Sequence, residues 1–573
     1  MHDLTKGQQL ARSYKAKRSA RSIWIAKWER AAEWVAPQDA EVKAGEQLQV
    51  ESPVVTERAH VHDTTAIKAS SKLGNAHMSF ITPLGEQWMR YEPPIGLEDN
   101  EAAKGWYKRC SEIVMDKLSS SNFYTEVHQV YNDRAKFGTG AHLTLITNGK
   151  LHFRYVSLGM FDFEESMTGE INDFCYEEYW TLAQIVEEWG EDNLGEKLKE
   201  KCTQARQKSE EWGRQYMVVT HIKERSQAER ELTNTGQAKY DQKNKAFGKY
   251  VLCMEDEDHI IEEGGFDNMI ATVSRYHKWG RHKWGFTPTF NALPDIHSAN
   301  YFFMLLKTIG EGHAMPRLVA LAESLHQIDL RAGGITYVSK EGAAMNMPKE
   351  IGSQARFDVG AALLEMLQKS IEDFYHVPLF QMLHDIDRQM TATEVAARER
   401  EKLLLFAPSF TQFVTDMNPM MLRIFTELLK QGIFPDPPAG VFETTDDGTK
   451  VRVEDPKVSY QSKVALAIKA LQGEGLDRVM ARMLPLFEAA PDVLDNFDLD
   501  KIVRDLSRNE NVPDRWLKDW EEVKDMRDQR AAEMQQMQEM AMVEQAAKAS
   551  GQASPENIAQ LQDMAEQAEV EAS

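Results

Sequence analysis

The sequence predicts an α+β protein in which helices predominate. Trp24, Trp28 and Val35 recur at helical spacing near the start of the chain. The stretch 141–180 is rich in β-forming residues, and after residue 295 long runs with helical periodicity take over. Strands followed by a mainly helical second half are typical of the α+β class.

Composition limits the function. The chain has 573 residues, with 67 Lys and Arg against 90 Asp and Glu, so its formal net charge is −23. A protein that coats nucleic acid needs a basic surface to neutralise phosphates. The acidic balance therefore argues against general DNA coating, although it is compatible with a role that guides DNA without holding it.

The cysteines and apolar segments indicate a reduced, cytoplasm-like compartment. Cys110, Cys175, Cys202 and Cys253 are widely spaced and fit neither a zinc ribbon nor a disulfide framework. The N-terminus lacks the apolar core of a signal peptide, and no run of about 18 apolar residues is present. We therefore expect neither export by a leader nor a membrane span.

The first ~290 residues are expected to form one α+β body. Its first ~125 residues are expected to be helical, with one run that ends at Pro37 and a second over 64–80. Asn148-Gly149 and Thr168-Gly169 are hairpin signals. The expected strands are 142–147, 150–159, 171–180, 216–224, 250–256 and 268–277, and a charged helix is expected over 182–212.

Two clusters in this body have alternative interpretations. Residues 1–30 carry eight Lys and Arg and two acids, which would suit an acidic neighbour, a capsid protein or DNA, whereas the tryptophans there favour ordinary packing. His277, His282 and His297 lie in an aromatic-rich stretch that we interpret as a packed joint.

The second half is expected to alternate helices with short inserts. A kinked helix is predicted from 296 to about 325, then a hairpin-like insert over 328–352, then a helix that stops near Val377-Pro378. Residues 379–390 show no periodicity, and Thr391 with Glu394 forms a capping box for a helix bent at Pro408 and Pro419. Helices are then predicted over 460–487, 498–506 and 513–547, before a tail that is expected to be flexible and acidic.

No catalytic, metal or cofactor site is predicted. The nucleotide-binding loop and the usual hydrolase and zinc motifs are absent from the sequence. The strongest polar cluster contains Asp385 and Asp387, and closely spaced carboxylates can hold the divalent ions of a nuclease. A solvated or interface loop is the competing interpretation.

Five stretches, in this order, resemble the portal, or head-to-tail connector, proteins of short-tailed bacteriophages. They are HDTTAIKASSKLGNAHMSFITPLGEQWMR (62–90), FGTGAHLT (137–144) with FRYVSLGMFDF (153–163), ALPDIHSAN (292–300), LRAGGITYV (330–338) and FQMLHDIDRQMTATEVAAREREKL (380–403). The resemblance extends over roughly residues 8–540.

The resemblance implies the phage portal fold, with the chain divided into layers of one ring subunit. These layers are a wing (1–293), a first stem helix (294–325), a clip (326–353), a second stem helix (354–378), a tunnel loop (379–392), a long kinked wing helix with a return strand (393–458), a helical crown (459–547) and a flexible acidic tail (548–573).

The same resemblance implies a dodecameric ring at one capsid vertex of the virion, assembled in the host cytoplasm. Double-stranded DNA would pass through it during packaging and ejection. Its partners would be the major capsid and scaffolding proteins, the packaging ATPase (large terminase) and then the tail adaptor, without a membrane. The candidate DNA-facing residues are His384, Asp385, Asp387, Arg388 and Gln389, and the candidate clip contacts are Arg331, Lys340 and Lys349.

Two other classes of function stay open at this point. One is a metal-dependent nucleic-acid-processing enzyme that uses Asp385 and Asp387. The other is an internal scaffold or core protein of the virion, which would form no central hole.

Overall fold

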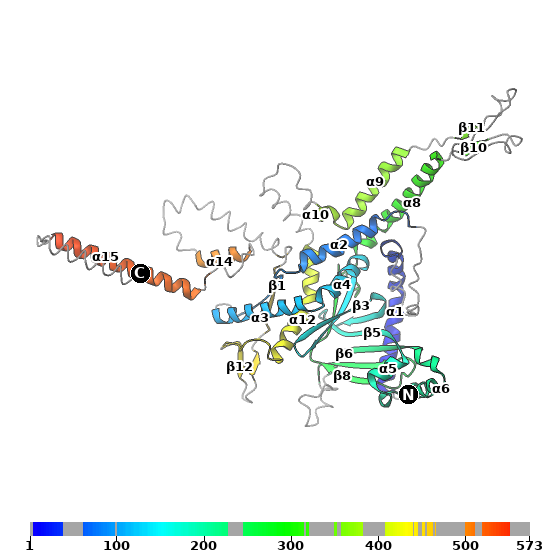
Figure 1. The fold of residues 1–573 in the computed structure, drawn as a ribbon, viewed down its shortest axis with the longest axis horizontal. Coiled ribbons are helices and arrows are strands. Elements are labelled where there is room, and N and C mark those ends of the chain that lie inside the picture. Colours follow the sequence, from blue (N-terminus) through cyan, green and yellow to red (C-terminus); the bar gives the residue numbers. More distant parts are fainter. Residues whose placement is uncertain are drawn as a thin grey trace. The chain divides into compact units, whose positions relative to one another are not determined.

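The computed structural model describes most of the first 461 residues and two later helices. The described residues are 4–37, 61–97, 100–226, 245–314, 317–319, 349–351, 357–381, 407–438, 440–444, 450–452, 455–461, 465, 499–509, 518 and 520–549. The chain divides into two compact units, Met1–Ile468 and Lys469–Ser573, and each is described by itself. Figure 1 shows the elements along the chain.

Two antiparallel sheets form the β part of the first unit. The larger sheet has five strands in the order β4-β5-β6-β7-β8, and the smaller has three in the order β3-β2-β9. The five strands of the first sheet are Phe161–Glu165, Ile171–Thr181, Gln215–Glu224, Phe247–Cys253 and Glu262–Phe266. The strands of the second, in chain order, are β2 (Thr139–Thr147), β3 (Lys150–Val156) and β9 (Ala271–Arg275).

The predicted hairpins are confirmed. β2 and β3 pair from Thr147 and Lys150 onwards, and the two residues between them, Asn148 and Gly149, have φ angles of 49° and 71°. Such left-handed angles match the twist of the flanking strands and favour an Asn-Gly pair. The register that follows puts Leu143 and Phe153 on opposite faces of the sheet, and each is buried in a different apolar cluster.

Helices surround these sheets in the first unit. They are α1 (Lys6–Val35), α2 (Thr65–Ile81), α3 (Glu101–Ser120), α4 (Phe123–Phe137), α5 (Leu182–Trp189), α6 (Glu196–Gln207), α8 (Pro288–Ala314), α9 (Phe357–Phe374), α10 (Val377–Gln381) and α12 (Ala407–Lys430), with 3₁₀ turns at Leu158–Met160, Glu191–Asn193 and Ser209–Gly213. Short strand pairs join β1 (Met89–Glu92) to β14 (Lys457–Tyr460), β10 (Arg317–Val319) to β11 (Lys349–Ile351) and β12 (Phe442–Thr444) to β13 (Lys450–Arg452).

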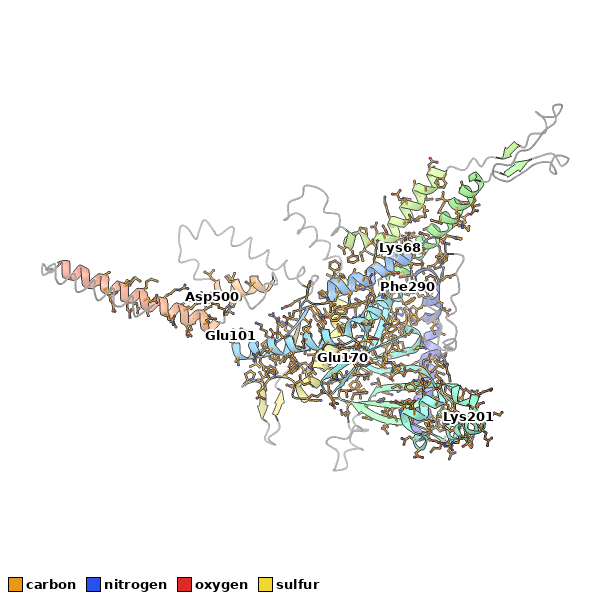
Figure 2. All side chains as sticks on the ribbon, viewed as in Figure 1. Lys68, Glu101, Glu170, Lys201, Phe290 and Asp500 are labelled. Carbon is orange, nitrogen blue, oxygen red and sulfur yellow. The ribbon has the colours of Figure 1, made fainter. Side chains whose placement is uncertain are left out.

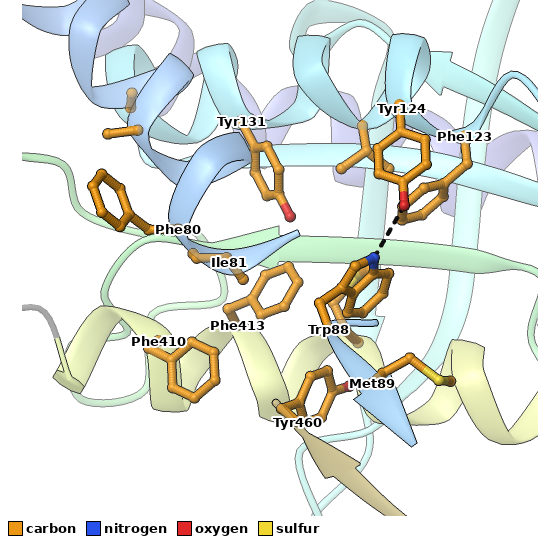
Figure 3. Packing of buried hydrophobic residues seen from close by; sticks show 14 of the residues in the cluster. Phe80, Ile81, Trp88, Met89, Phe123, Tyr124, Tyr131, Phe410, Phe413 and Tyr460 are labelled. Atoms are coloured by element: carbon orange, nitrogen blue, oxygen red, sulfur yellow. Dashed lines mark hydrogen bonds between the residues drawn. The ribbon is translucent and has the colours of Figure 1, made fainter. Parts of the chain in front are cut away.

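The largest apolar core brings distant segments of the chain together. Trp88 stacks between Phe123 and Tyr460, at ring distances of 5.9 and 6.3 Å, and its indole N–H donates to the Tyr124 hydroxyl at 3.2 Å (Figure 3). The β1–β14 pairing puts Met89 opposite Tyr460 in the same place. The return strand therefore closes the core that α12 and the early helices share.

Buried charges fasten α12 to the smaller sheet. Arg275 on β9 donates its backbone N–H to Asp416 at 2.8 Å and its guanidinium to the same carboxylate at 2.7 Å. Arg134 on α4 donates to the carbonyl of Arg275 at 3.0 Å and to the carbonyl of Ser409 at 2.5 Å. Three elements that are far apart in the sequence meet at these groups.

The basic N-terminal helix uses much of its charge within the chain. Lys17 pairs with Asp173 at 2.7 Å in a buried position, and Arg18 and Arg21 lie 3.8 and 3.9 Å from Glu177. Trp28 is buried against Trp284. For these residues the predicted acidic neighbour is the chain's own five-stranded sheet, and the packing role expected of the tryptophans holds for Trp28.

Several predicted boundaries were wrong because a contact or a backbone angle outweighs periodicity. The charged helix over 182–212 is broken at Gly190, whose φ is 76°, and resumes at Glu196. Residues 89–92, expected to be helical, form a strand because β14 pairs with them. The helix predicted from Tyr460 begins later, since Tyr460 is the last residue of that strand.

The helices of the second half of the chain also begin and end at other residues than predicted. α8 begins at Pro288, before the expected start at 294–296, because proline suits the first turn, where its missing N–H costs nothing. The helix expected to continue to 325 ends at Ala314, and Arg317–Val319 instead pairs with Lys349–Ile351. α9 ends at Phe374, close to Val377-Pro378 as predicted, but Val377 and Pro378 open α10 after a left-handed turn at His376, so residues 379–381 are helical.

The second unit is described by two helices, α14 (Leu499–Asn509) and α15 (Trp520–Ala549). Arg527 donates both guanidinium nitrogens to Asp500, at 2.6 and 2.7 Å, which ties the two helices together. α14 agrees with the helix predicted over 498–506 to within three residues, whereas α15 begins at Trp520, later than the predicted start at 513, and Lys518 is not helical.

Replacement of Asp416 should weaken the first unit strongly. Asp416→Asn is expected to lower the free energy of unfolding by about 3 kcal/mol, because the buried guanidinium of Arg275 loses one of its two carboxylate partners and keeps only Glu165. Glu101→Gln, which breaks the surface pair with Lys104, is the control and should change it by less than about 0.5 kcal/mol. Urea denaturation at one protein concentration measures both, and equal losses would contradict the role given to Asp416.

Acid should destabilise the fold partly through His142. Burial lowers the pKa of His142 from its usual value of 6.5 to about 4, so the unfolded chain binds this proton at a higher pH than the folded chain. Stability should therefore fall as the pH drops from about 6.5 towards 4. Between about pH 7 and pH 4.5, the free energy of unfolding of the His142→Gln chain should fall by about 2 kcal/mol less than that of the unaltered chain. Urea denaturation at each pH measures both. If the free energies of unfolding of the two chains change with pH by the same amount, His142 makes no such contribution.

Candidate functional site

The candidate site is the pair of helices α8 and α9, which lie side by side (Figure 1). The start of α8 is fixed by Thr287, whose hydroxyl accepts the Thr289 N–H at 3.3 Å and donates to the carbonyl of Ala135. Phe290, labelled in Figure 2, lies in this first part of the helix. The base of the pair is therefore anchored to the body.

Close packing holds the two helices together. A Cβ on Gly360 would lie 2.8 Å from the Leu306 side chain, so the absence of a side chain there permits the approach of α9 to α8. Ser370 donates to Asp295 at 2.7 Å, and Tyr375 donates to Thr289 at 2.9 Å. The two hydrogen bonds join the first part of α8 to the end of α9.

The side of α8 that points away from α9 is apolar. Ala299 and Leu306 are buried in the main core, yet Tyr301 and Met304, which lie roughly half a helical turn away, are exposed, with Tyr301 at 56 %. Leu305 is exposed with them. Every side chain over residues 301–306 is apolar, and an exposed apolar cluster of this kind is typical of a surface that contacts a partner.

α9 also exposes apolar side chains. Leu364 and Ile371 are buried, whereas Val359, Met366 and Phe374 are exposed, with Met366 at 61 %. The pair thus exposes apolar side chains on each of its two helices.

A short strand ladder closes the end of the pair that points away from the body. Val319 on β10 is opposite Lys349 on β11, and Arg317 is opposite Ile351. This ladder agrees with the predicted hairpin-like insert between two helices. Of the three predicted clip contacts, Lys349 is on this ladder, and Arg331 and Lys340 lie outside the described residues.

The predicted tunnel-loop residues also lie outside the described residues. They are His384, Asp385, Asp387, Arg388 and Gln389. The structure places α10 directly before them. In the ranges that the structure does describe, no group of three or more His, Cys, Asp or Glu side chains is arranged to hold a metal ion.

A pocket of about 460 Å³ lies at the base of the helix pair. Its wall combines aromatic and apolar groups from the segment before α8 with polar groups at the end of α9. The lining includes His277, Phe286, Pro288, Asp373, Phe374 and His376. Sequence patterns did not reveal this pocket, because its wall comes from segments that are about 90 residues apart.

The aromatic-rich stretch before α8 is only in part the packed joint that was predicted. Tyr276 and Trp284 are buried, and Lys283 pairs with the buried Asp162 at 2.5 Å. Trp279, in contrast, is 66 % exposed. The sequence contains the same four residues twice, HKWG at 277–280 and 282–285, and only the second copy packs its tryptophan into the core.

The comparisons with known proteins agree on one family. The sequence model of the family described as "Bacteriophage head to tail connecting protein" matches residues 7–517. The chain belongs to this family. Among curated proteins, it is 25 % identical over 496 residues to the probable portal protein of Bordetella phage BPP-1, with 84 % of each chain covered. It is also 23 % identical over 498 residues to the portal protein of Salmonella phage epsilon15, with 85 % of each covered.

These relations support the portal, or head-to-tail connector, function that the sequence resemblance predicted. Neither the nuclease hypothesis based on Asp385 and Asp387 nor the internal scaffold hypothesis is favoured by them. As a head-to-tail connecting protein, the chain is a component of the phage particle where head and tail join. Among the helices of the described ranges, none has the length and apolar composition needed to span a membrane.

Proposed function

We propose that copies of this chain assemble into a closed dodecameric ring at one capsid vertex, and that double-stranded DNA passes through its channel during packaging and ejection. The observation that carries the proposal is the presence of two exposed apolar faces on the α8–α9 pair, around Met304 and around Met366. Family membership supports the same assembly.

Two different faces on one subunit suit a ring. A contact in which one face of a copy meets a different face of the next copy is heterologous, and it closes into a ring when the rotation between copies returns to the start. In the proposed ring, the α8 face of each copy packs on the α9 face of its neighbour. Apolar area that would otherwise stay in water is then buried.

The charge of the chain suits a channel for a polyanion. A net charge of −23 opposes tight binding of DNA along the path, so the duplex can slide. Local cations would supply brief phosphate contacts. Arg388 in the tunnel loop, together with Arg331, Lys340 and Lys349 in the clip, are the candidates.

Each proposed partner would bind a different layer of the ring subunit. The clip between α8 and α9 would bind the large terminase during packaging and the tail adaptor afterwards. The wing, residues 1–293 with the long helix α12, would meet the major capsid and scaffolding proteins. The second unit would form the crown inside the capsid.

Charge placed on either apolar face should prevent ring formation. Met304→Glu and Met366→Lys are each expected to convert rings into monomers or short oligomers, because a buried unpaired charge cannot be tolerated at a packed interface. Size-exclusion chromatography and end-on electron micrographs provide the measurement. Met167→Glu, at a fully exposed methionine in the turn between β4 and β5, is the control and should leave rings with a central hole.

A mixture of two altered chains tests the heterologous contact directly. Met304→Glu and Met366→Glu chains each keep one intact face, and their altered faces carry like charges, so together they should form dimers and no rings. Rings in the mixture, or rings in either variant alone, would contradict the proposed packing of α8 on α9.

Substitutions in the tunnel loop should affect DNA and not assembly. Asp385→Ala or Arg388→Ala is expected to leave ring formation intact and to lower the amount of genome packaged or retained. Rings are scored by micrographs, and genome content by quantitative DNA measurement on purified virions. An unchanged genome content would remove the tunnel-loop assignment, and divalent-dependent nicking of plasmid DNA that Asp385→Ala abolishes would favour the enzyme hypothesis.

A further inference from the structure

A basic and aromatic surface lies where α1 packs against the start of α8. Lys27 on α1 lies 4.7 Å above the ring of Phe286, and the His282 ring lies 5.7 Å from the same phenylalanine. The backbone N–H of His282 donates to the carbonyl of Trp279 at 3.2 Å. Trp279 is 66 % exposed, and Ile23, one helical turn before Lys27, is 79 % exposed. Two large apolar side chains therefore stand in water beside a lysine.

Three cations of this surface form no ion pair among the described residues. They are Lys27, Arg30 and Arg281, and all three are exposed. The lysines next to Arg281 are used differently, because Lys278 pairs with Glu165 at 2.6 Å and Lys283 with Asp162 at 2.5 Å. Partial burial against the rings lowers the pKa of Lys27 from its usual value of 10.5, and no neighbouring carboxylate in the described ranges opposes this shift. The surface thus carries positive charge that the fold itself does not neutralise.

The pocket at the base of the helix pair belongs to the same surface. Phe286 lines the pocket and also lies under Lys27. His277 lines it too, and its ring lies 6.2 Å from that of Trp279. We call this continuous region the Phe286 surface, which comprises the pocket together with Ile23, Lys27, Arg30, Trp279 and Arg281. A pocket of about 460 Å³ has room for one large apolar side chain.

This chemistry fits an acidic segment of a protein that carries a bulky apolar side chain. Unpaired cations attract carboxylates, and tryptophan and arginine beside a pocket are typical anchors of protein contacts. A DNA duplex fits less well, because it presents phosphates along a rod and has no side chain that enters a pocket. Asp373 lines the pocket on the α9 side, so the carboxylates of a partner belong on the α1 side.

The surface lies apart from the α8 residues that we assign to the contact between copies. Met304 lies sixteen residues beyond Pro288, the first residue of α8, or about 24 Å further along the helix. Pro288 itself lines the pocket. A different protein can therefore bind at the base of α8 while a neighbouring copy contacts its far half.

We propose that the Phe286 surface binds an acidic segment of a partner protein that is not a copy of this chain. A bulky apolar side chain of that segment lies in the pocket, and its carboxylates face Lys27, Arg30 and Arg281. The docking does not depend on the proposed ring, since every contact that carries it lies within one copy.

Binding of short labelled peptides to the full-length chain tests this docking. The probe is fluorescein-labelled Gly-Asp-Glu-Phe-Asp-Glu-Gly, and the matched peptide has Asn and Gln in place of its acids. Fluorescence anisotropy should show the acidic peptide bound at least about tenfold more tightly, and Trp279→Ala or Arg281→Glu should each weaken it at least about tenfold. Arg109→Glu, at an exposed arginine on α3, is the control and should change nothing.

The same peptides are measured on the Met304→Glu chain, so that a neighbouring copy in a ring does not hide the pocket. Binding to neither chain, or an equal loss with Arg109→Glu and Arg281→Glu, would overturn the docking. Absence of rings with peptide binding intact would remove the proposed ring and leave this inference. Rings with no peptide binding to either chain would do the reverse.

Photochemical cross-linking identifies the natural occupant. p-Benzoylphenylalanine replaces Trp279 in cells that produce the phage, and mass spectrometry locates the cross-linked residues. We expect a different protein, joined through a segment that contains Asp or Glu beside a bulky apolar residue. Cross-links to a second copy of this chain, to DNA, or to segments without acids would contradict the assignment.

Discussion

The fold depends on a buried charge network where α4, β9 and α12 meet. Asp416 receives two hydrogen bonds from Arg275, and Arg134 links Arg275 to Ser409 at the start of α12. Burial raises the pKa of the Asp416 carboxyl, and the adjacent guanidinium of Arg275 opposes this by favouring its charged form. A buried carboxylate of this kind is tolerated only while its partners stay in place. The position of α12 is therefore coupled to that of the smaller sheet, and the sheet leads directly through β9 into the segment before α8.

This coupling makes the α8–α9 pair an extension of a rigid base. Thr287 and Thr289 hold the start of α8 to α4, and Tyr375 ties the end of α9 to the same place. A helix pair anchored in this way can present apolar faces to a neighbour at a fixed orientation. In the proposed ring, a fixed orientation between neighbouring copies would allow many identical contacts to close.

The local features were predictable because their causes are local. The hairpin at Asn148-Gly149 and the helix that ends before Pro37 depend on residues a few positions apart. The strand at residues 89–92 was missed because it exists through pairing with 457–460, which no local pattern reveals.

In the candidate site, too, local features could be predicted from the sequence and contacts between distant residues could not. The apolar run near Tyr301 was visible in the sequence, but its exposure was not, since periodicity cannot distinguish a helix buried in its own fold from one that awaits a partner. The ion pair of Lys17 with Asp173 likewise required the structure, because it joins residues on separate elements.

The β10–β11 ladder has a consequence for how such a protein can change over generations. Because Arg317–Val319 and Lys349–Ile351 are bonded to each other, the ends of the segment between them are held together by the ladder itself. Insertions, deletions and substitutions within that segment are thereby uncoupled from the packing of α8 on α9. The chain thus has one place where a lineage can acquire a new binding partner without rebuilding the body that carries it.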